Sequence, residues 1–201
     1  MTSWEDGLPP RVRERLEQIG DLTPEEKQRM KDDEVLSGLV VDYFKGELST
    51  DDLWQKLKAY KDEGKTAILK DVQIKIMDAI RFGTSDDELA SQKKGLVAIE
   101  SLKDEPDMAL FEQGFDAIAN LKRQYEQEKT QVYQAIKGQV EQNPDLRMQQ
   151  VQQGGQRIVM QLSVEDAIKM NPQYKNFLTQ HETKYNQAFS EMIDGIRTAI
   201  K

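Results

Sequence analysis

The chain has 201 residues, of which 37% are hydrophobic and 32% charged, with a net charge of −8 and no cysteine. This length can bury a real core as one large domain or two small ones. A charged content above the roughly 25% of ordinary globular chains favours exposed, elongated helices. The lack of cysteine excludes disulfides and thiolate metal sites, and it is compatible with a reducing cytoplasm.

No targeting or membrane segment is expected. The first ten residues, MTSWEDGLPP, have neither a basic region nor an apolar core, so they do not form a signal peptide. The longest apolar runs, such as Leu39–Val41, are far shorter than the roughly 18 residues that a membrane span needs. The sequence therefore predicts a soluble, cytoplasmic protein.

The charge is distributed unevenly along the chain. Residues 1–110 hold 17 Lys and Arg against 25 Asp and Glu, whereas residues 111–201 hold 11 of each. Glutamine shows the opposite trend, with 5 before residue 111 and 16 from there on. The first part is solvated mainly by acidic residues and the second part by uncharged glutamines as well, which predicts two structural units.

The first part predicts short, capped helices. A helix is expected over residues 9–19, with two prolines in its first turn. Thr23, followed by Pro24, Glu25 and Glu26, has the sequence of a capping box. The apolar stripe that follows, from Val35 to Phe44, fits either one long helix or two shorter ones.

Three further helices are expected before residue 104, over residues 50–63, 65–82 and 86–103. The second is ambiguous, because Val72, Ile74 and Ile76 alternate as in a strand. However, Ile68, Val72, Ile76 and Ile80 are each four residues apart, which predicts a helix. Because Ile74 lies off this stripe, the helix is expected to be nearly surrounded by protein. Together these elements predict an acidic helical bundle over residues 8–104.

The second part predicts a long helical hairpin over residues 105–201. Residues 107–142 contain no proline and carry a coiled-coil-like seam in which Phe111, Ile118, Tyr125 and Val132 are seven apart. A second seam begins after Asn171-Pro172 and runs from Tyr174 to Ile200. Two long helices with matching seams most simply pack as an antiparallel pair. The expected fold class is therefore all-α.

The tip of this hairpin, residues 143–171, is less regular. We expect a short helix at 144–152, a break at Gly154-Gly155, and a second short helix at 164–170 capped by Ser163. The alternative is that the stretch QRIVMQL is a strand in a small β-hairpin turning at the glycine pair.

No catalytic, metal or cofactor site is expected. His181, the one histidine, lies between Leu178 and Tyr185 on a buried seam, which predicts a packed side chain rather than a base or a ligand. Neither a calcium-binding loop nor a glycine-rich phosphate-binding loop is present. Most clusters of acidic residues precede or begin a helix, where they complement the helix dipole.

The charge also argues against nucleic acid as a partner, because phosphate binding needs a clustered positive surface. The basic face formed by Arg11, Arg13 and Arg15 is small and contains acidic neighbours. A regulator acting on nucleic acid through this face, or mimicking its phosphates with acidic residues, is the alternative function.

The tip is the most informative feature for function. Its apolar residues lie at the end of a thin arm among glutamines and glycines, and methionine suits surfaces that accept varied partners. We expect a non-enzymatic adaptor, scaffold or chaperone-like protein that contacts another protein or a second copy of itself. The expected contact residues are Met148, Val151, Ile158, Met160, Leu162 and Met170. The competing interpretation is that these residues pack on one another as a small core.

Overall fold

The computed structural model describes residues 23–153 and 156–200, and it confirms an all-α fold with one small two-stranded sheet. The chain divides into two compact units, Met1–Ser49 and Thr50–Lys201. The helix expected over residues 9–19 and the basic face of Arg11, Arg13 and Arg15 lie outside the described residues.

The described part of the first unit is one helix, α2 (Pro24–Phe44), which settles the choice between one helix and two. It begins with the predicted capping box: Glu26 N–H donates to Thr23 Oγ1, and Thr23 N–H donates to the Glu26 carboxylate. The chain leaves the helix at Gly46, whose φ of 74° suits a residue without a β-carbon. The early turns are exposed, and the buried side chains follow later: Leu36, Leu39, Val40 and Tyr43.

The second unit starts with three short helices, α3 (Thr50–Asp62), α4 (Ala67–Ala79) and α5 (Asp86–Glu100). All three lie within the predicted ranges. The ambiguous segment is helical, as the four-residue spacing predicted, and α4 is buried on much of its circumference. Its buried residues are Ile68, Leu69, Val72, Gln73, Ile76 and Met77.

A buried carboxylate joins these helices to the next one. Glu100, at the end of α5, accepts hydrogen bonds from Gln73 Nε2 at 2.8 Å and from the Asp107 backbone N–H at 3.0 Å, and it pairs with Lys103 at 2.8 Å. Burial opposes ionisation most strongly, but these partners together hold the pKa of Glu100 below its usual value. The boundary expected at residues 104–105 lies inside this second unit, where α5 packs along α6.

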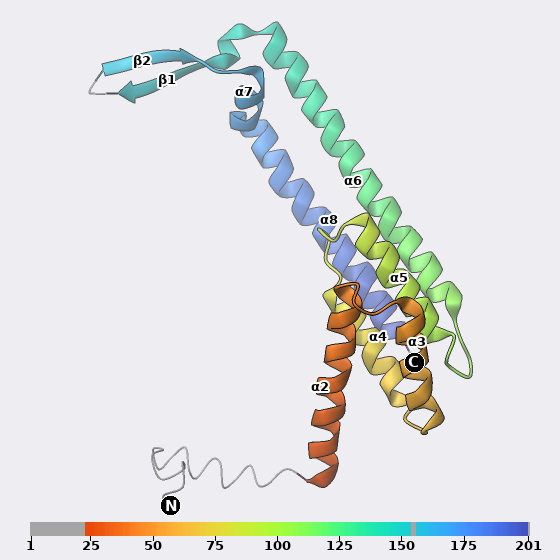
Figure 1. Ribbon diagram of the computed structural model, residues 1–201. Coiled ribbons are helices and arrows are strands. Elements are labelled where there is room, and N and C mark those ends of the chain that lie inside the picture. The colour runs from red at the N-terminus through yellow and green to blue at the C-terminus, as the bar shows by residue number, and fades with distance from the viewer. Residues whose placement is uncertain (1–22, 154–155, 201) are drawn as a thin grey trace, which may run out of the picture. The chain divides into compact units, whose positions relative to one another are not determined.

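The two longest helices, α6 (Met108–Gln142) and α8 (Pro172–Ala199), run antiparallel and side by side (Figure 1). At 1.5 Å per residue they are about 52 Å and about 42 Å long. The short helices pack against one end of the pair, and the other end extends beyond them. The predicted seams supply the contact, with these residues buried: Phe111, Phe115, Ile118, Ile136 and Val140 from α6, and Tyr174, His181, Tyr185, Phe189, Ile193 and Ile196 from α8.

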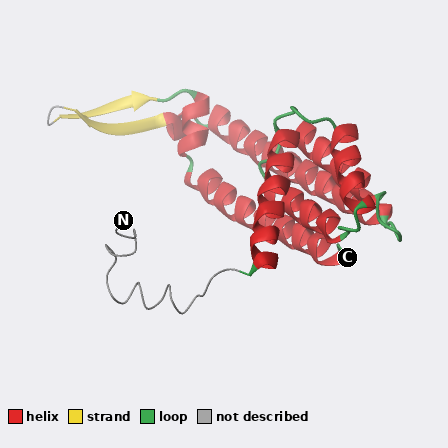
Figure 2. Ribbon diagram, turned by 60° about the horizontal axis from the view of Figure 1, so that its bottom comes forward, coloured by secondary structure: helices red, strands yellow, loops and turns green. Residues whose placement is uncertain are grey.

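The predicted tip is partly wrong. Residues 144–152 do not form a helix: a single 3-10 turn, η2 (Pro144–Arg147), leads into strand β1 (Met148–Gln153). Strand β1 pairs antiparallel with β2 (Gln156–Gln161), so the alternative β-hairpin is correct (Figure 2). The second short helix, α7 (Val164–Met170), is confirmed, and Asp166 N–H donates to its cap, Ser163 Oγ, at 3.0 Å.

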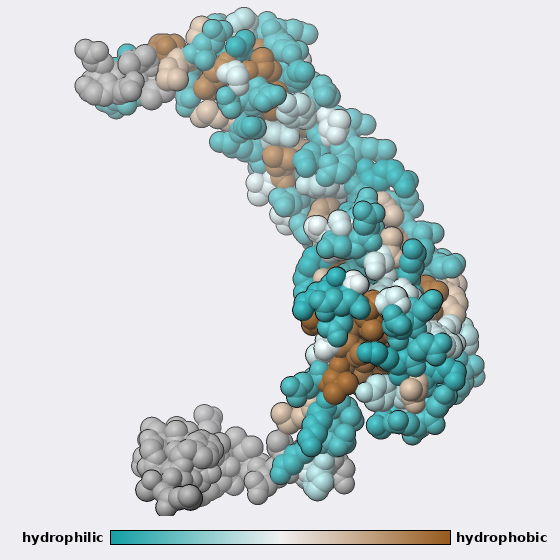
Figure 3. All heavy atoms as spheres, viewed as in Figure 1, coloured by the Kyte–Doolittle hydropathy of each residue, from teal (hydrophilic) through white to brown (hydrophobic). Residues whose placement is uncertain are grey.

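The surface of the second unit has both hydrophobic and hydrophilic regions. Hydrophobic residues gather where α7 lies, whereas the visible face of α6 is mainly hydrophilic (Figure 3). Among the described residues, no helix combines the length and the apolar character that crossing a membrane requires.

A glycine sets the spacing between the long helices near the end that the short helices cover. A β-carbon at Gly114 would lie 2.5 Å from Ile196 Cδ1 and 2.8 Å from its Cγ1, and Ile196 is itself buried. Gly138, in the same helix, has no heavy atom within 4 Å of such a β-carbon. Close approach of α6 and α8 therefore depends on glycine at position 114 but not at position 138.

This difference predicts opposite effects of alanine in one helix. Gly138→Ala should raise the free energy of unfolding by about 0.5–1 kcal/mol through helix propensity. The free energy of unfolding of Gly114→Ala should be about 1–3 kcal/mol lower than that of Gly138→Ala, because Ile196 must shift in a packed seam. Urea unfolding of both variants measures the difference, and equal stabilities would show that the seam tolerates a methyl group at this point.

Candidate functional site

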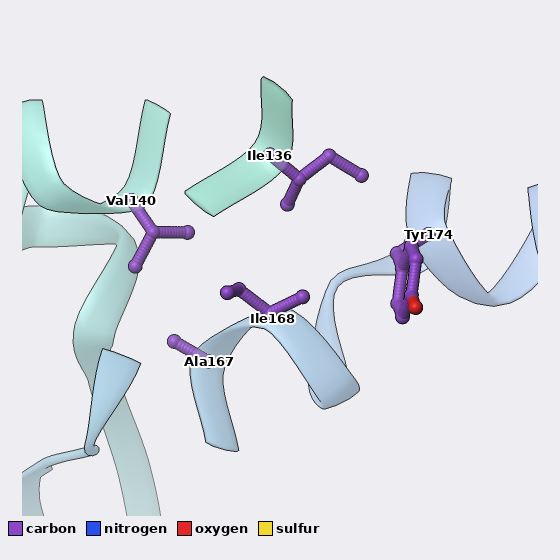
Figure 4. Close-up of a cluster of buried hydrophobic side chains, with 5 residues drawn as sticks. All are labelled: Ile136, Val140, Ala167, Ile168 and Tyr174. Carbon is purple, nitrogen blue, oxygen red and sulfur yellow. The ribbon is translucent and has the colours of Figure 1, made fainter. Parts of the chain in front are cut away.

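A small core closes the end of the α6–α8 pair that the short helices leave uncovered. Helix α7 packs across this end, and Ile168 lies among side chains from α6 and α8 (Figure 4). Ile168 is fully buried, and Leu162, Val164, Phe177 and Leu178 add partly buried contacts. The cluster's buried members are Ile136, Val140, Ala167, Ile168 and Tyr174. This small core holds in place the base of the β-hairpin.

Arg147 ties the two strands together at that base. Its Nε donates to the Leu162 carbonyl at 2.8 Å, and the Leu162 N–H donates to the Arg147 carbonyl at 2.8 Å. From this point the ribbon of β1 and β2 projects away from the helical pair (Figures 1 and 2). Its register is regular, from Met148 opposite Gln161 to Gln153 opposite Gln156.

The six residues predicted to bind a partner differ in their exposure. Met148, Met160 and Met170 are exposed, at 51%, 50% and 43%. Leu162 instead packs on the small core, which supports the competing interpretation for that residue. Positions 151 and 158 are paired in the strand register, but their side chains lie outside what the structure describes.

Two exposed apolar residues of the tip, Val159 and Leu146, were not among the six predicted contact residues. Val159 is 60% exposed in β2, and Leu146 is 49% exposed in the 3-10 turn. Alternation along a strand places Val159 on the same face of the ribbon as its neighbour Met148, and Met160 on the opposite face. A strand assignment for residues 148–161 would have identified Val159, since exposure of both ribbon faces follows from a sheet of two strands.

The ribbon also differs electrostatically from the rest of the chain. No Asp or Glu occurs between residues 146 and 164, in a protein with 36 acidic residues. Strand β1, MQQVQQ, has no charged residue and no proline, whereas β2 contains Arg157. Native edge strands are usually protected by charge, proline or a bulge. The outer edge of β1 has none of these.

His181 occupies the middle of the helical pair, as predicted for a packed histidine. It is 5% exposed and stacks between Tyr125 and Phe177, with ring centroids 4.8 and 4.6 Å away. Its Nε2 lies 3.1 Å from the Tyr125 carbonyl, within hydrogen-bonding distance. Nδ1 lies 3.5 Å from the Glu128 carboxylate.

Tyr185 packs against this histidine and is also buried. Loss of solvation, followed by the adjacent Glu128 carboxylate, raises the pKa of Tyr185 to about 12. Gln124 Nε2 donates to Glu128 at 2.9 Å, and this hydrogen bond, followed by the neighbouring Tyr185 hydroxyl, lowers the pKa of Glu128. These interactions stabilise the helical pair, and the aromatic rings leave the histidine little access to solvent.

Two concave regions lie elsewhere on the second unit. A cleft of about 480 Å³ between α4 and α8 brings together Asp78 and Asp194. Both carboxylates pair with Arg197, at 2.9 and 2.8 Å, and these contacts, Asp78 first, raise the pKa of the arginine. Since both carboxylates are engaged by the same arginine, the geometry of this cleft indicates a structural ion-pair cluster.

The second region is an open groove beside α6, lined by Asp86, Lys122 and Arg123 among others. Lys122 donates to the Thr84 carbonyl at 2.6 Å and to Asp86 at 2.7 Å, so it is engaged in holding the start of α5. Within residues 23–153 and 156–200, no three His, Asp or Glu side chains converge as a metal site. The projecting ribbon is therefore the best candidate for a functional surface.

Comparison with known proteins gives a family but no activity. Residues 54–201 match the model of a family of unknown function, DUF6657, and this covers more than half of the chain. The chain belongs to that family. The match includes most of the second unit, with both long helices and the tip, and excludes α2. No curated protein and no solved structure matches this chain.

The small core predicts a local effect of a single truncation. Ile168→Ala should reduce stability by about 2–4 kcal/mol, because it leaves a cavity beneath α7. Hydrogen exchange should accelerate mainly in residues 143–171, with α3–α5 little changed. Met170→Ala, at an exposed position of the same helix, should stay within about 0.5 kcal/mol of wild type. Equal effects of the two variants would contradict the packing of α7.

The raised pKa of Tyr185 predicts a loss of stability at alkaline pH. Below pH 10.0, the ordinary pKa, the phenol is protonated in both folded and unfolded chains, and its contribution is complete. Between this value and about 12, the unfolded chain releases the proton while the folded chain retains it, which favours unfolding. The free energy of unfolding should thus fall with pH more steeply in wild type than in Tyr185→Phe, as measured by urea unfolding across this range. Parallel pH profiles for the two proteins would contradict the shift.

Proposed function

We propose that this chain is a non-enzymatic protein–protein interaction protein, an adaptor, scaffold or chaperone-like binder, whose β-hairpin contacts the partner. The single observation that carries the proposal is the projecting ribbon of β1 and β2, which exposes Met148, Val159 and Met160. Exposed apolar side chains mark protein-binding surfaces, whereas phosphate binding needs a cluster of cations, and the two strands hold only Arg157.

The mode of contact follows from the backbone. A sheet of two strands has two edges, and each presents unpaired N–H and C=O groups to an incoming extended segment. Adding a strand to such an edge is a recurring way of binding a peptide, with backbone hydrogen bonds supplying affinity. The apolar residues on the two faces of the ribbon would supply selectivity.

The helical pair contributes to this function by supporting the hairpin and holding it away from the short helices. Its seam and the small core form a rigid support for the hairpin, and the uncovered half of the pair separates the hairpin from the short helices. We place the interaction in the cytoplasm, in keeping with a chain that has no cysteine.

A site-specific photo-crosslinking experiment in the native host tests the proposal. The photoreactive residue replaces Gln152 on β1 in the full chain, and a matched control replaces Gln134, an exposed glutamine on α6. We expect crosslinked protein products from position 152 that are absent from position 134. The triple change Met148→Ser, Val159→Ser and Met160→Ser should remove them.

A control substitution makes this result specific. Met30→Ser, at an exposed position of α2, should leave the crosslinks from position 152 unchanged. Crosslinks that persist in the triple variant, or the absence of any protein product from position 152, would exclude the hairpin as the contact surface.

A further inference from the structure

The outer edge of β1 presents backbone groups that do not pair with β2, and β1 has no charged residue or proline to protect this edge. Leu162 N–H donates to the Arg147 carbonyl next to the rung formed by Met148 and Gln161. Closely and widely spaced pairs alternate in an antiparallel ladder, so every second residue of β1 turns its backbone groups away from β2. These residues are Met148, Gln150 and Gln152. Their N–H and C=O groups have no ladder partner in β2.

We infer that this edge pairs with β1 of a second copy of the chain, so that two hairpins form one four-stranded antiparallel sheet about a two-fold axis. The inference rests on the proposed function and names the partner. A two-fold axis normal to the sheet keeps the faces of both ribbons aligned, and pairing centred on Gln150 uses all three outward residues. Gln150 then lies opposite its own copy, and Met148 opposite Gln152 of the second chain.

Strand β1 is suited to pairing with itself. Its six residues contain four glutamines and no charge, so no like charges face one another in the paired sheet. The side-chain amide of Gln150 can both donate to and accept from its copy across the two-fold axis. The nearby cation, Arg147, already donates to the Leu162 carbonyl. Strand β2 differs because Arg157 would have to be accommodated along its edge.

Charge on the rest of the molecule favours contact at the tips. Two chains of net charge −8 repel one another, but residues 146–164 contain no acid. In the second unit the acidic starts of α3 and α5 lie toward the other end of the long pair, where Asp86 pairs with Lys122 of α6. Residues 111–201 hold 11 Lys and Arg against 11 Asp and Glu, so this part of the chain adds no net repulsion.

Stability of the ribbon supplies a further reason. A sheet of only two strands is marginally stable in water, whereas sheets of three or more strands with a covered face are stable. Pairing of two ribbons doubles the sheet and satisfies the outward backbone groups of both β1 strands. The interface is small, so the dimer is weak and its population depends on concentration.

Sedimentation of the full chain over concentrations from micromolar to near-millimolar tests the inference. The average mass of wild type should rise from that of one chain, 23.1 kDa, toward twice that value. Gln150→Pro removes an outward N–H of β1 without removing a ladder hydrogen bond, so it should remain at the mass of one chain throughout. Gln161→Pro makes the same change at an outward position of β2 and should dimerise as wild type does.

Circular dichroism of both proline variants establishes that each retains the helical fold, and hydrogen exchange of β1 reports pairing in wild type at high concentration. A wild type that remains monomeric at all concentrations overturns the inference. So does a mass that grows past two chains, or equal dimerisation of the two proline variants. If wild type is monomeric while position 152 still crosslinks a different protein, the second copy is excluded and the proposed function stands.

Discussion

The packing of α6 against α8 is the constraint on which the second unit depends. Each helix carries one apolar stripe too long to be covered by the short helices, so the two stripes must cover each other. This requires the chain to reverse direction at residues 143–171, and it requires close approach at Gly114, where a methyl group would meet Ile196. The position of every residue in the tip follows from that reversal.

The reversal creates a second packing problem, which the tip solves. Where the long helices end, Ile136, Val140 and Tyr174 would be left open, and α7 covers them with Ala167 and Ile168. Once α7 has taken this place, the residues between η2 and α7 cannot reach the small core except at Leu162. They pair with one another instead, and the resulting ribbon presents apolar side chains and backbone edges to its surroundings.

Charged residues have different roles in different parts of the chain. Acidic residues begin α3 and α5, where they complement the helix dipole, and the salt bridge between Lys122 and Asp86 fixes α5 to α6. The buried Glu100 joins three segments through hydrogen bonds that offset its loss of hydration. The ribbon has no acid at all and residues 111–201 carry no net charge, so no excess of acid opposes contact between two ribbons. This distribution connects the fold to the proposed interaction.

Local signals were enough to predict the helices, because capping boxes, apolar periodicity and glycine stops act over a few residues. The starts of α2, α5 and α8 were predictable for this reason. The sequence also identified the antiparallel pair, the packed histidine and the tip as the surface of interest. The strand conformation of residues 148–153 could not be predicted from local signals, because glutamine is a good helix former. The strand forms only through its pairing with residues 156–161, which is a tertiary contact. Tertiary structure likewise decided that Leu162 is half-buried while Val159 and Met160 are exposed. That difference depends on where α7 docks, which no local pattern of residues contains.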